Sequence, residues 1–163
     1  MVAARQKILS LAAAVRHLDD QRQRGRRVVL ANGCFDVLHV GHVRYLEGAR
    51  AEGDFLVVGV NADSSVRALK GAGRPILPAA ARAELVAALA AVNLVVLFDD
   101  LTVEPLLEAL RPHVHAKGTD YTAATVPERE VAARLGIRVA IVGDPKRHST
   151  RELLARISES QDG

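Results

Sequence analysis

Two histidines and two glycines stand close together near the start of the chain, in "NGCFDVLHVGH", residues 32–42. His39 and His42 are three residues apart, so both imidazoles can face one bound group if a helix begins there. Gly41 lacks a Cβ and would let an anion approach the exposed N–H groups of that helix start, while Gly33 would relax the backbone before it. Residues of these types at this spacing favour a turn that binds phosphate.

Two other interpretations of the histidines stay open. A zinc pair would need a third ligand, and the i, i+4 spacing of H-E-x-x-H is absent. A structural role would leave both rings satisfied by backbone groups. Asp36 could cap the loop, orient a histidine or hold a backbone amide. Cys34 is the single cysteine, which excludes an internal disulfide, and it has no neighbouring base in sequence that would indicate a nucleophile.

Short apolar, β-branched runs alternate with longer segments of helical period along the whole chain. The expected strands are residues 28–31, 55–60, 93–98, 113–117 and 137–143, and the expected helices are residues 43–50, 80–92, 102–112, 127–136 and 149–157. This alternation predicts an α/β fold with a doubly wound, Rossmann-like parallel sheet covered by helices on both faces. Ligands of such folds bind at the carboxyl ends of the strands, where residues 32–42 would lie.

The size and composition of the chain narrow the function classes. With 163 residues, of which 49% are hydrophobic, we expect a single domain at residues 26–160 with an N-terminal helix, residues 1–25, packed on it. No apolar run approaches the roughly 18 residues of a membrane span, and no signal peptide is evident, so a cytoplasmic location is expected. A net charge of +3 with only 3% aromatic residues favours a small anionic ligand over nucleic acid.

The segment "GCFDVLHVGH" matches the F-D-x-x-H-x-G-H signature of the cytidylyltransferase-like nucleotidyltransferases, which are related in fold to class I aminoacyl-tRNA synthetases. Within that superfamily, residues 26–157 resemble the adenylyltransferases that make ADP-heptose from ATP and D-glycero-β-D-manno-heptose 1-phosphate. Four further segments carry the closer resemblance: "GVNADSSVRALKGAGRPI", "ARAELVAAL", "HAKGTDY" and "HSTRELLARI". Cytidylyltransferases acting on glycerol 3-phosphate or another polyol phosphate share most of the signature and are the alternative.

The resemblance implies a chemistry. The sugar phosphate would attack the α-phosphorus of ATP and pyrophosphate would leave, without a covalent enzyme intermediate. Mg²⁺ would be bound mainly through the triphosphate, and no protein ligand to the metal is identified. A homodimer, with neither nucleic acid nor membrane as a partner, is the corresponding expectation.

The resemblance also implies site residues. His39, His42 and Lys70 would be catalytic, contacting the phosphates of the nucleotide. The implied nucleotide-binding residues are Gly33, Cys34, Phe35, Asp36, Gly41, Ala116, Lys117, Gly118, Asp120, Ser149 and Thr150. Arg74 and Arg82 are candidates for the acceptor phosphate, although Arg82 could equally hold the site together or be a solvated helix charge.

Several positions keep a structural interpretation or depart from the family pattern. His113, His115 and Tyr121 are interpreted as structural, and Ser149 and Thr150 are also natural helix caps. Arg151 stands where many relatives have a third hydroxyl residue, and residues 146–148 differ from the expected loop. These departures leave the acceptor open.

Overall fold

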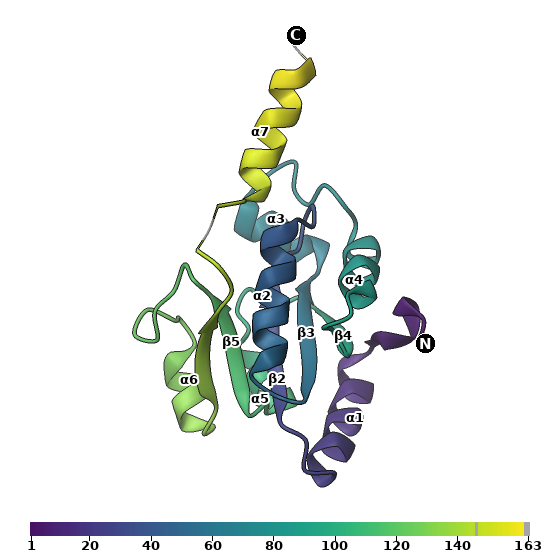
Figure 1. Cartoon of the computed structure of the whole chain (residues 1–163), viewed down its shortest axis with the longest axis vertical. Helices are drawn as coiled ribbons and strands as arrows, with labels where there is room; N and C mark the ends of the chain where they lie inside the picture. The colour runs from purple at the N-terminus through teal and green to yellow at the C-terminus, as the bar shows by residue number, and fades with distance from the viewer. Residues whose placement is uncertain (146, 162–163) are drawn as a thin grey trace.

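The computed structural model describes residues 1–145 and 147–161 and contains one six-stranded parallel sheet (Figure 1). The strands are β1 (Ile8–Leu9), β2 (Val28–Gly33), β3 (Phe55–Asn61), β4 (Leu94–Phe98), β5 (Val114–Gly118) and β6 (Arg138–Val142). Their order across the sheet is β1-β4-β3-β2-β5-β6. The predicted doubly wound α/β domain is therefore confirmed.

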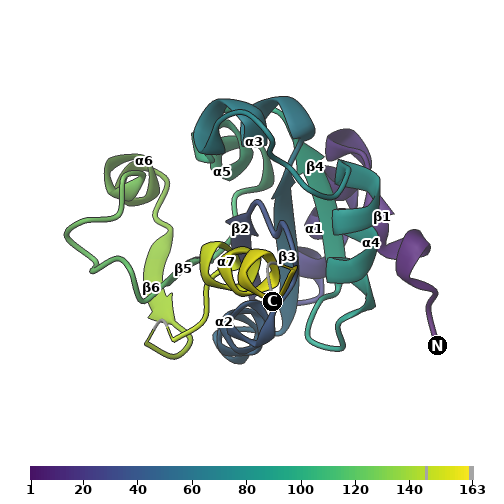
Figure 2. The ribbon, with the colours of Figure 1, turned by 90° about the horizontal axis from the view of Figure 1, so that it is seen from above.

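Helices cover both faces of this sheet, which explains why its central strands β2 and β3 are apolar until they reach Asn32 and Asn61 at their carboxyl ends. The helices are α1 (Leu11–Gln23), α2 (Val40–Ala51), α3 (Asp63–Lys70), α4 (Ala79–Ala88), α5 (Glu104–Leu110), α6 (Arg129–Arg134) and α7 (Thr150–Gln161), with a 3-10 turn at Ala4–Lys7. Helices α2 and α4 contribute to one core cluster, and α1, α5 and α6 contribute to the other. Figure 2 shows the sheet between α2 and α5.

The topology fixes where a ligand can bind. From β2 the chain winds outward through β3 to β4, whereas β5 and β6 lie on the opposite side of β2. The strand order thus reverses between β2 and β5. Loops leaving the carboxyl ends of these two strands diverge, and the crevice between them is the usual ligand site of an open α/β sheet.

The elements differ from the sequence-based expectation in four places. The expected helix over residues 1–25 is confined to Leu11–Gln23, because Ile8–Leu9 pair with β4 as an edge strand. Strand β2 continues through Gly33, so residues 32 and 33 are not yet a turn. Helix α2 begins at Val40, which puts His42 in its first turn. Helix α3 was not predicted, because its eight residues form a short segment in which only Val66, Ala68 and Leu69 are apolar.

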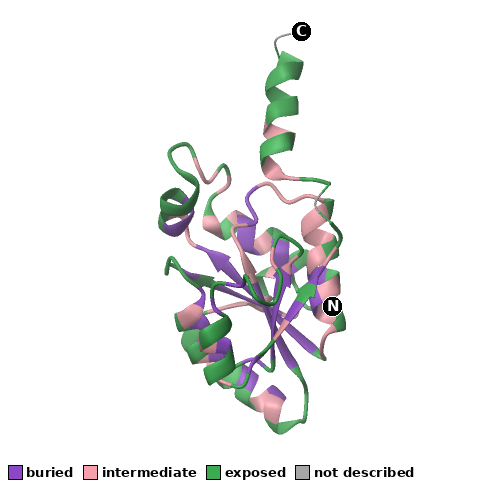
Figure 3. Cartoon of the chain, turned by 90° about the vertical axis from the view of Figure 1, so that its left-hand side faces the viewer, coloured by how far each residue is buried: buried purple, intermediate pink, exposed green. Residues whose placement is uncertain are grey.

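Helix α7 differs from the others because it extends away from the sheet (Figures 1 and 3). None of its described residues is buried, and Ile157 is half exposed. Its first residues are attached to the body of the domain, as shown below. No helix in the described part of the chain is both long and apolar enough to cross a membrane.

Candidate active site

A cavity of about 750 Å³ opens at the carboxyl ends of β2 and β5, at the point where the strand order reverses. Its lining brings together four stretches that are distant in sequence. From the first half of the chain it includes Asn32, Gly33, Cys34, Phe35, Asp36, His39, Gly41, His42, Arg44, Tyr45, Asn61, Leu69, Lys70 and Arg74. From the second half it includes Lys117, Gly118, Thr119, Asp120, Tyr121, Val142, Gly143, Asp144, Pro145, Arg147, His148, Ser149, Thr150 and Arg151.

His39 and His42 form a stacked pair at the start of α2. Their ring centroids are 3.9 Å apart with an interplanar angle of 29°. His39 is the N-cap residue, and its Nδ1 accepts the N–H of Gly41 at 3.1 Å, while Nδ1 of His42 accepts the N–H of His39 at 3.2 Å. The first turn of the helix therefore fixes both rings in place before any ligand binds.

These contacts also decide which nitrogen of each ring carries the proton. An Nδ1 that accepts a backbone N–H has its lone pair there, so the neutral imidazole is protonated at Nε2. Each histidine thus has an Nε2–H donor, and both residues line the cavity. Such donors suit an anionic oxygen better than a metal ion, which would need the Nε2 lone pair.

Two glycines in this motif are required by packing. A Cβ on Gly41 would lie 2.9 Å from Cε1 of His39, so any larger residue would displace the folded-back ring. A Cβ on Gly33 would lie 3.2 Å from the Phe35 ring, which is buried and meets His42 edge-on at 5.3 Å. Phe35 therefore supports the histidine from behind in addition to lining the cavity.

The turn between β2 and α2 is held by Asp36. Its buried carboxylate accepts the N–H groups of Ile76 and Leu77 at 2.8 to 3.0 Å, and Nε of Arg74 lies 2.7 Å away. Burial opposes ionisation, but the backbone hydrogen bonds and the guanidinium outweigh it and lower the pKa of Asp36. Of the roles left open for Asp36, the structure shows the one in which the carboxylate holds backbone amides, and Asp36 also lines the cavity.

The backbone of this turn is unusual. Phe35 and Val37 have φ values of 49° and 61°, in the left-handed region that a β-branched residue such as Val37 rarely adopts. Conformations of this kind persist where surrounding contacts determine them, and they concentrate at functional sites. Here the carboxylate of Asp36 and the hydroxyl of Thr150, which donates to the Asp36 carbonyl at 2.8 Å, supply those contacts.

Arg82 corrects one prediction. It is fully buried in α4 and does not line the cavity, so it is neither a solvated charge nor placed to meet an acceptor phosphate. Its guanidinium donates to the carbonyls of Leu77, Cys34 and Asn61 and to the carboxylate of Asp63, at 2.6 to 2.9 Å. Arg82 therefore ties the ends of β2 and β3 to the loop that follows α3.

Lys70 and Arg74 remain at the cavity, as predicted from the motif. Lys70 is the last residue of α3 and is exposed, and Arg74 is engaged with Asp36 only through Nε. Cys34 lines the cavity between them. Burial raises the pKa of its thiol despite the nearby cations Lys70 and Arg82, which argues against a thiolate nucleophile.

The carboxyl end of β5 and the segment that follows it are only partly as expected. Lys117, Gly118 and Asp120 line the cavity, whereas Ala116 is fully buried and its carbonyl accepts the hydroxyl of Tyr45 at 2.8 Å. The structure thus does not support base recognition by Ala116. Nζ of Lys117 is 3.6 Å from Oε2 of Glu128 and 4.6 Å from the centre of the Tyr121 ring. Tyr121 therefore makes a cation–π contact with Lys117 in addition to packing.

At the start of α7, Ser149 and Thr150 both line the cavity, but their hydroxyls are used differently. The Ser149 hydroxyl accepts the N–H of Glu152 as a helix cap and keeps its own proton to donate. The Thr150 hydroxyl donates to Asp36 and so is not available as a donor to phosphate. Arg151, Arg147 and His148 add donors to the same wall; residue 146 lies outside the described residues.

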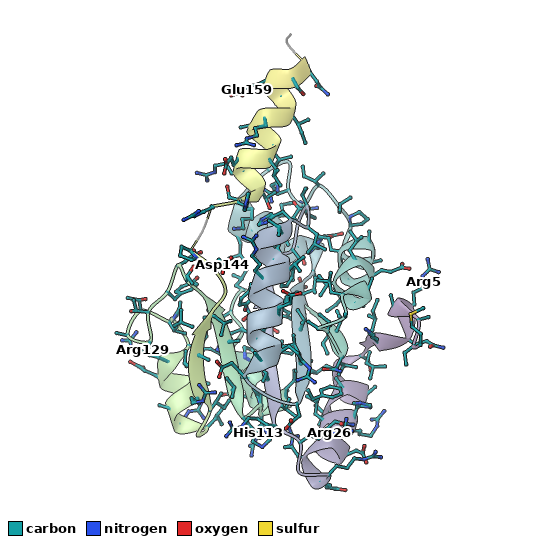
Figure 4. The ribbon with its side chains drawn as sticks, in the orientation of Figure 1. Arg5, Arg26, His113, Arg129, Asp144 and Glu159 are labelled. Carbon is teal, nitrogen blue, oxygen red and sulfur yellow. The ribbon has the colours of Figure 1, made fainter. Side chains whose placement is uncertain are left out.

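His113, which directly precedes β5, and His115, within β5, occupy different places. His113 lies at the end of the sheet opposite Asp144, a cavity residue (Figure 4), and its Nδ1 accepts the N–H of Val28 at 2.9 Å. His115 is fully buried, and its Nε2 lies 3.0 Å from Oδ1 of Asn32. Both are built into the fold, but His115 contacts a residue of the cavity wall.

Several cavity residues were missed from sequence. Arg44 and Asp144 form an ion pair at 3.1 Å across the cavity rim, and Tyr45 and Asn61 join α2 and β3 to the wall. Tyr45 follows His42 by three residues, a helical spacing that could have marked it. Nothing local to Asp144 or Asn61 indicates that the fold brings them there.

The fold and the cavity define a class: an α/β protein in which a histidine pair and several cations line a cavity at the carboxyl ends of the strands. A profile of the cytidylyltransferase-like family matches residues 30–153, and the chain belongs to that family. It is accordingly a nucleotidyltransferase. The predicted superfamily and enzyme class are confirmed.

Individual relatives agree with this assignment. The chain is 48% identical over 151 residues to the bifunctional protein HldE of Geotalea uraniireducens (strain Rf4), and 49% identical over 154 residues to that of Acidiphilium cryptum (strain JF-5). These alignments cover 93% and 94% of this chain but 31% and 32% of the relatives, so the chain spans about a third of their length.

A solved structure shows the same fold. The lipopolysaccharide core biosynthesis protein from Thermoplasma volcanium GSS1 superposes with a TM-score of 0.64 and is 26% identical in sequence. The alignment covers 75% of this chain and 100% of that protein.

Proposed function

We propose that the chain transfers AMP from ATP to D-glycero-β-D-manno-heptose 1-phosphate, giving ADP-heptose and pyrophosphate. The observation that carries the reaction type is the stacked pair of His39 and His42, each protonated at Nε2 and lining the cavity. The acceptor is supported by the similarity to HldE proteins and to a protein of lipopolysaccharide core biosynthesis, together with the "HAKGTDY" and "HSTRELLARI" segments.

The proposed reaction is a single displacement. An oxygen of the sugar phosphate forms a bond to the α-phosphorus of ATP as the bond from that phosphorus to the bridging oxygen breaks, and pyrophosphate takes the electron pair. The Nε2–H groups of His39 and His42 donate to the phosphate oxygens as charge develops on them. Because the α2 turn holds both rings in advance, little reorganisation is needed at the moment of transfer.

Cations and helix N–H donors balance the negative charge of the leaving pyrophosphate. We assign this role to Lys70 and Arg74, which line the cavity, and to the Ser149 hydroxyl and the first N–H groups of α7, which begins at the cavity wall. Cys34 has no nucleophilic role in this scheme, in keeping with its raised pKa. Asp36 and Arg82 hold the loops and contact no substrate.

Mg²⁺ is part of the proposal as the ion that accompanies the triphosphate. Among the described residues, no three acidic, histidine or cysteine side chains lie close enough together to hold a metal ion. The cavity carboxylates Asp120 and Asp144 could each supply one oxygen ligand. When bound, Mg²⁺ would neutralise charge on the phosphates.

A pyrophosphate-release assay tests the proposal. Purified protein with Mg²⁺ is given ATP or CTP in combination with heptose 1-phosphate, glycerol 3-phosphate or another sugar phosphate. We expect fastest release with ATP and heptose 1-phosphate. Preference for CTP with glycerol 3-phosphate would replace the acceptor assignment by the cytidylyltransferase alternative, and no release with any pair would contradict the proposed reaction.

A further inference from the structure

Asn32 lies between the buried interior and the cavity. It stands near the carboxyl end of β2, two residues after Leu30, so its side chain faces the same side of the sheet as that core residue. On that side Oδ1 of Asn32 is 3.0 Å from Nε2 of His115, a fully buried residue of the adjacent strand β5. Asn32 itself is partly exposed and lines the cavity.

The protonation of His115 determines which edge of the Asn32 carboxamide faces the cavity. Burial lowers the pKa of His115 to about 3, so the ring is neutral and carries one proton. Nδ1 of His115 has no hydrogen-bond partner among the described residues. A proton on Nδ1 would leave a buried N–H without an acceptor, which folded proteins tolerate less readily than an unmatched lone pair. The proton therefore belongs on Nε2.

A protonated Nε2 donates to Oδ1 of Asn32, and this fixes the orientation of the carboxamide. The NH₂ group is then on the edge turned away from His115, and no described residue accepts a hydrogen bond from it. The same wall already contains the cations Lys70, Arg74 and Lys117. Asn32 adds to them a donor that is neutral and held in one orientation from behind.

We propose that Asn32 is a substrate-contacting residue whose NH₂ group donates to a hydroxyl or phosphoryl oxygen of the bound substrate, and that His115 is the positioning residue that orients it. This inference rests on the proposed function. The oxygen can belong to ATP or to the sugar phosphate, because both are rich in such acceptors. A neutral donor recognises the oxygen without adding to the charge that the cations already provide.

Calorimetric binding of ATP and of heptose 1-phosphate to Asn32→Ala, Asn32→Asp and the wild type tests the contact without requiring turnover. We expect about 10- to 100-fold weaker binding of the contacted substrate with Asn32→Ala, the range for a hydrogen bond to a charged or polar group. Asn32→Asp should bind more weakly still where the oxygen is phosphoryl, because it places a carboxylate against that anionic oxygen. The substrate whose affinity falls identifies the source of the oxygen. Unchanged affinity for both substrates in Asn32→Ala would overturn the inference.

A double-mutant cycle tests the role of His115. His115→Leu should weaken binding of the same substrate several-fold in the wild-type background and have no further effect in the Asn32→Ala background. His113→Leu, directly before β5 and at the end of the sheet away from the cavity, is the matched control and should bind both substrates normally. Equal effects of His115→Leu in both backgrounds would contradict the positioning role.

The two possible failures are distinguishable. A wild-type protein that binds neither substrate contradicts the proposed function and the inference together. A wild type that binds and turns over both substrates, while Asn32→Ala does the same with unaltered KM values, contradicts only the inference.

Discussion

The first turn of α2 and the network around Asp36 and Arg82 are built in contrasting ways. In the turn, His39 and His42 are held by backbone N–H groups two or three residues away. In the network, the side chains of Asp36 and Arg82 are held by partners 5 to 48 residues away in the sequence. The turn presents donors to the cavity, whereas the network keeps the loops around it in place. The comparison separates residues that would act on the substrate from residues that only position others.

The largest expected effect comes from a substitution in the first turn of α2. His42→Ala removes an Nε2–H donor to the phosphates, and we expect kcat to fall by about 10²- to 10³-fold, as for other preorganised donors of this kind. Circular dichroism should show a folded protein, because only one helix cap is lost. His113→Ala is the control outside the cavity. Full activity of His42→Ala would remove the histidine pair from the mechanism.

On the network side, the expected loss is in stability. Arg82→Met keeps the length of the side chain but leaves the carbonyls of Cys34, Asn61 and Leu77 without their donor. We expect the free energy of unfolding in urea to fall by about 3 to 5 kcal/mol, the range for breaking a buried charged network. Arg16→Met on α1 is exposed and should change it by less than about 0.5 kcal/mol. Equal stability of the two variants would refute the scaffolding role.

A smaller effect on stability is expected at Asp36. Asp36→Asn replaces a carboxylate that accepts hydrogen bonds from two backbone N–H groups and an arginine by a neutral amide. We expect the free energy of unfolding at pH 7 to fall by about 1 to 3 kcal/mol. Because the folded protein lowers the pKa of Asp36, this advantage of the wild type is present at neutral pH. It is lost as the pH falls through the lowered value. Urea unfolding at pH 7 and in acid measures the difference, and a gap that persists unchanged in acid would contradict the assignment.

The smallest expected effect concerns His115. Its pKa of about 3 in the folded state lies below the ordinary value of 6.5, so the unfolded chain takes up a proton that the folded chain refuses. The stability that His115 contributes is complete above pH 6.5 and declines from there toward pH 3. Between pH 6.5 and 5.5 the free energy of unfolding of the wild type should fall by about 1 kcal/mol more than that of His115→Leu. Parallel unfolding curves of the two proteins over this interval would contradict it.

The same contrast explains what the sequence could predict. The apolar runs predicted every central strand. The segment "GCFDVLHVGH" led to His39, His42 and the family, because residues that act together in one turn are neighbours in the sequence. The sequence could not reveal that Arg82 is buried or that the Thr150 hydroxyl is directed to Asp36. Those facts depend on the packing of α4 and α7 against a distant loop. The edge strand Ile8–Leu9 was missed because two residues carry no periodicity.

Direct transfer between two bound substrates is tested by the stoichiometry of the wild-type reaction. Pyrophosphate and nucleotide sugar are measured together in a single time course with ATP, Mg²⁺ and heptose 1-phosphate, and again without the sugar phosphate. Direct transfer predicts one pyrophosphate for each ADP-heptose formed and no release when the acceptor is omitted. Sustained pyrophosphate release from ATP alone, or release without ADP-heptose, would contradict it.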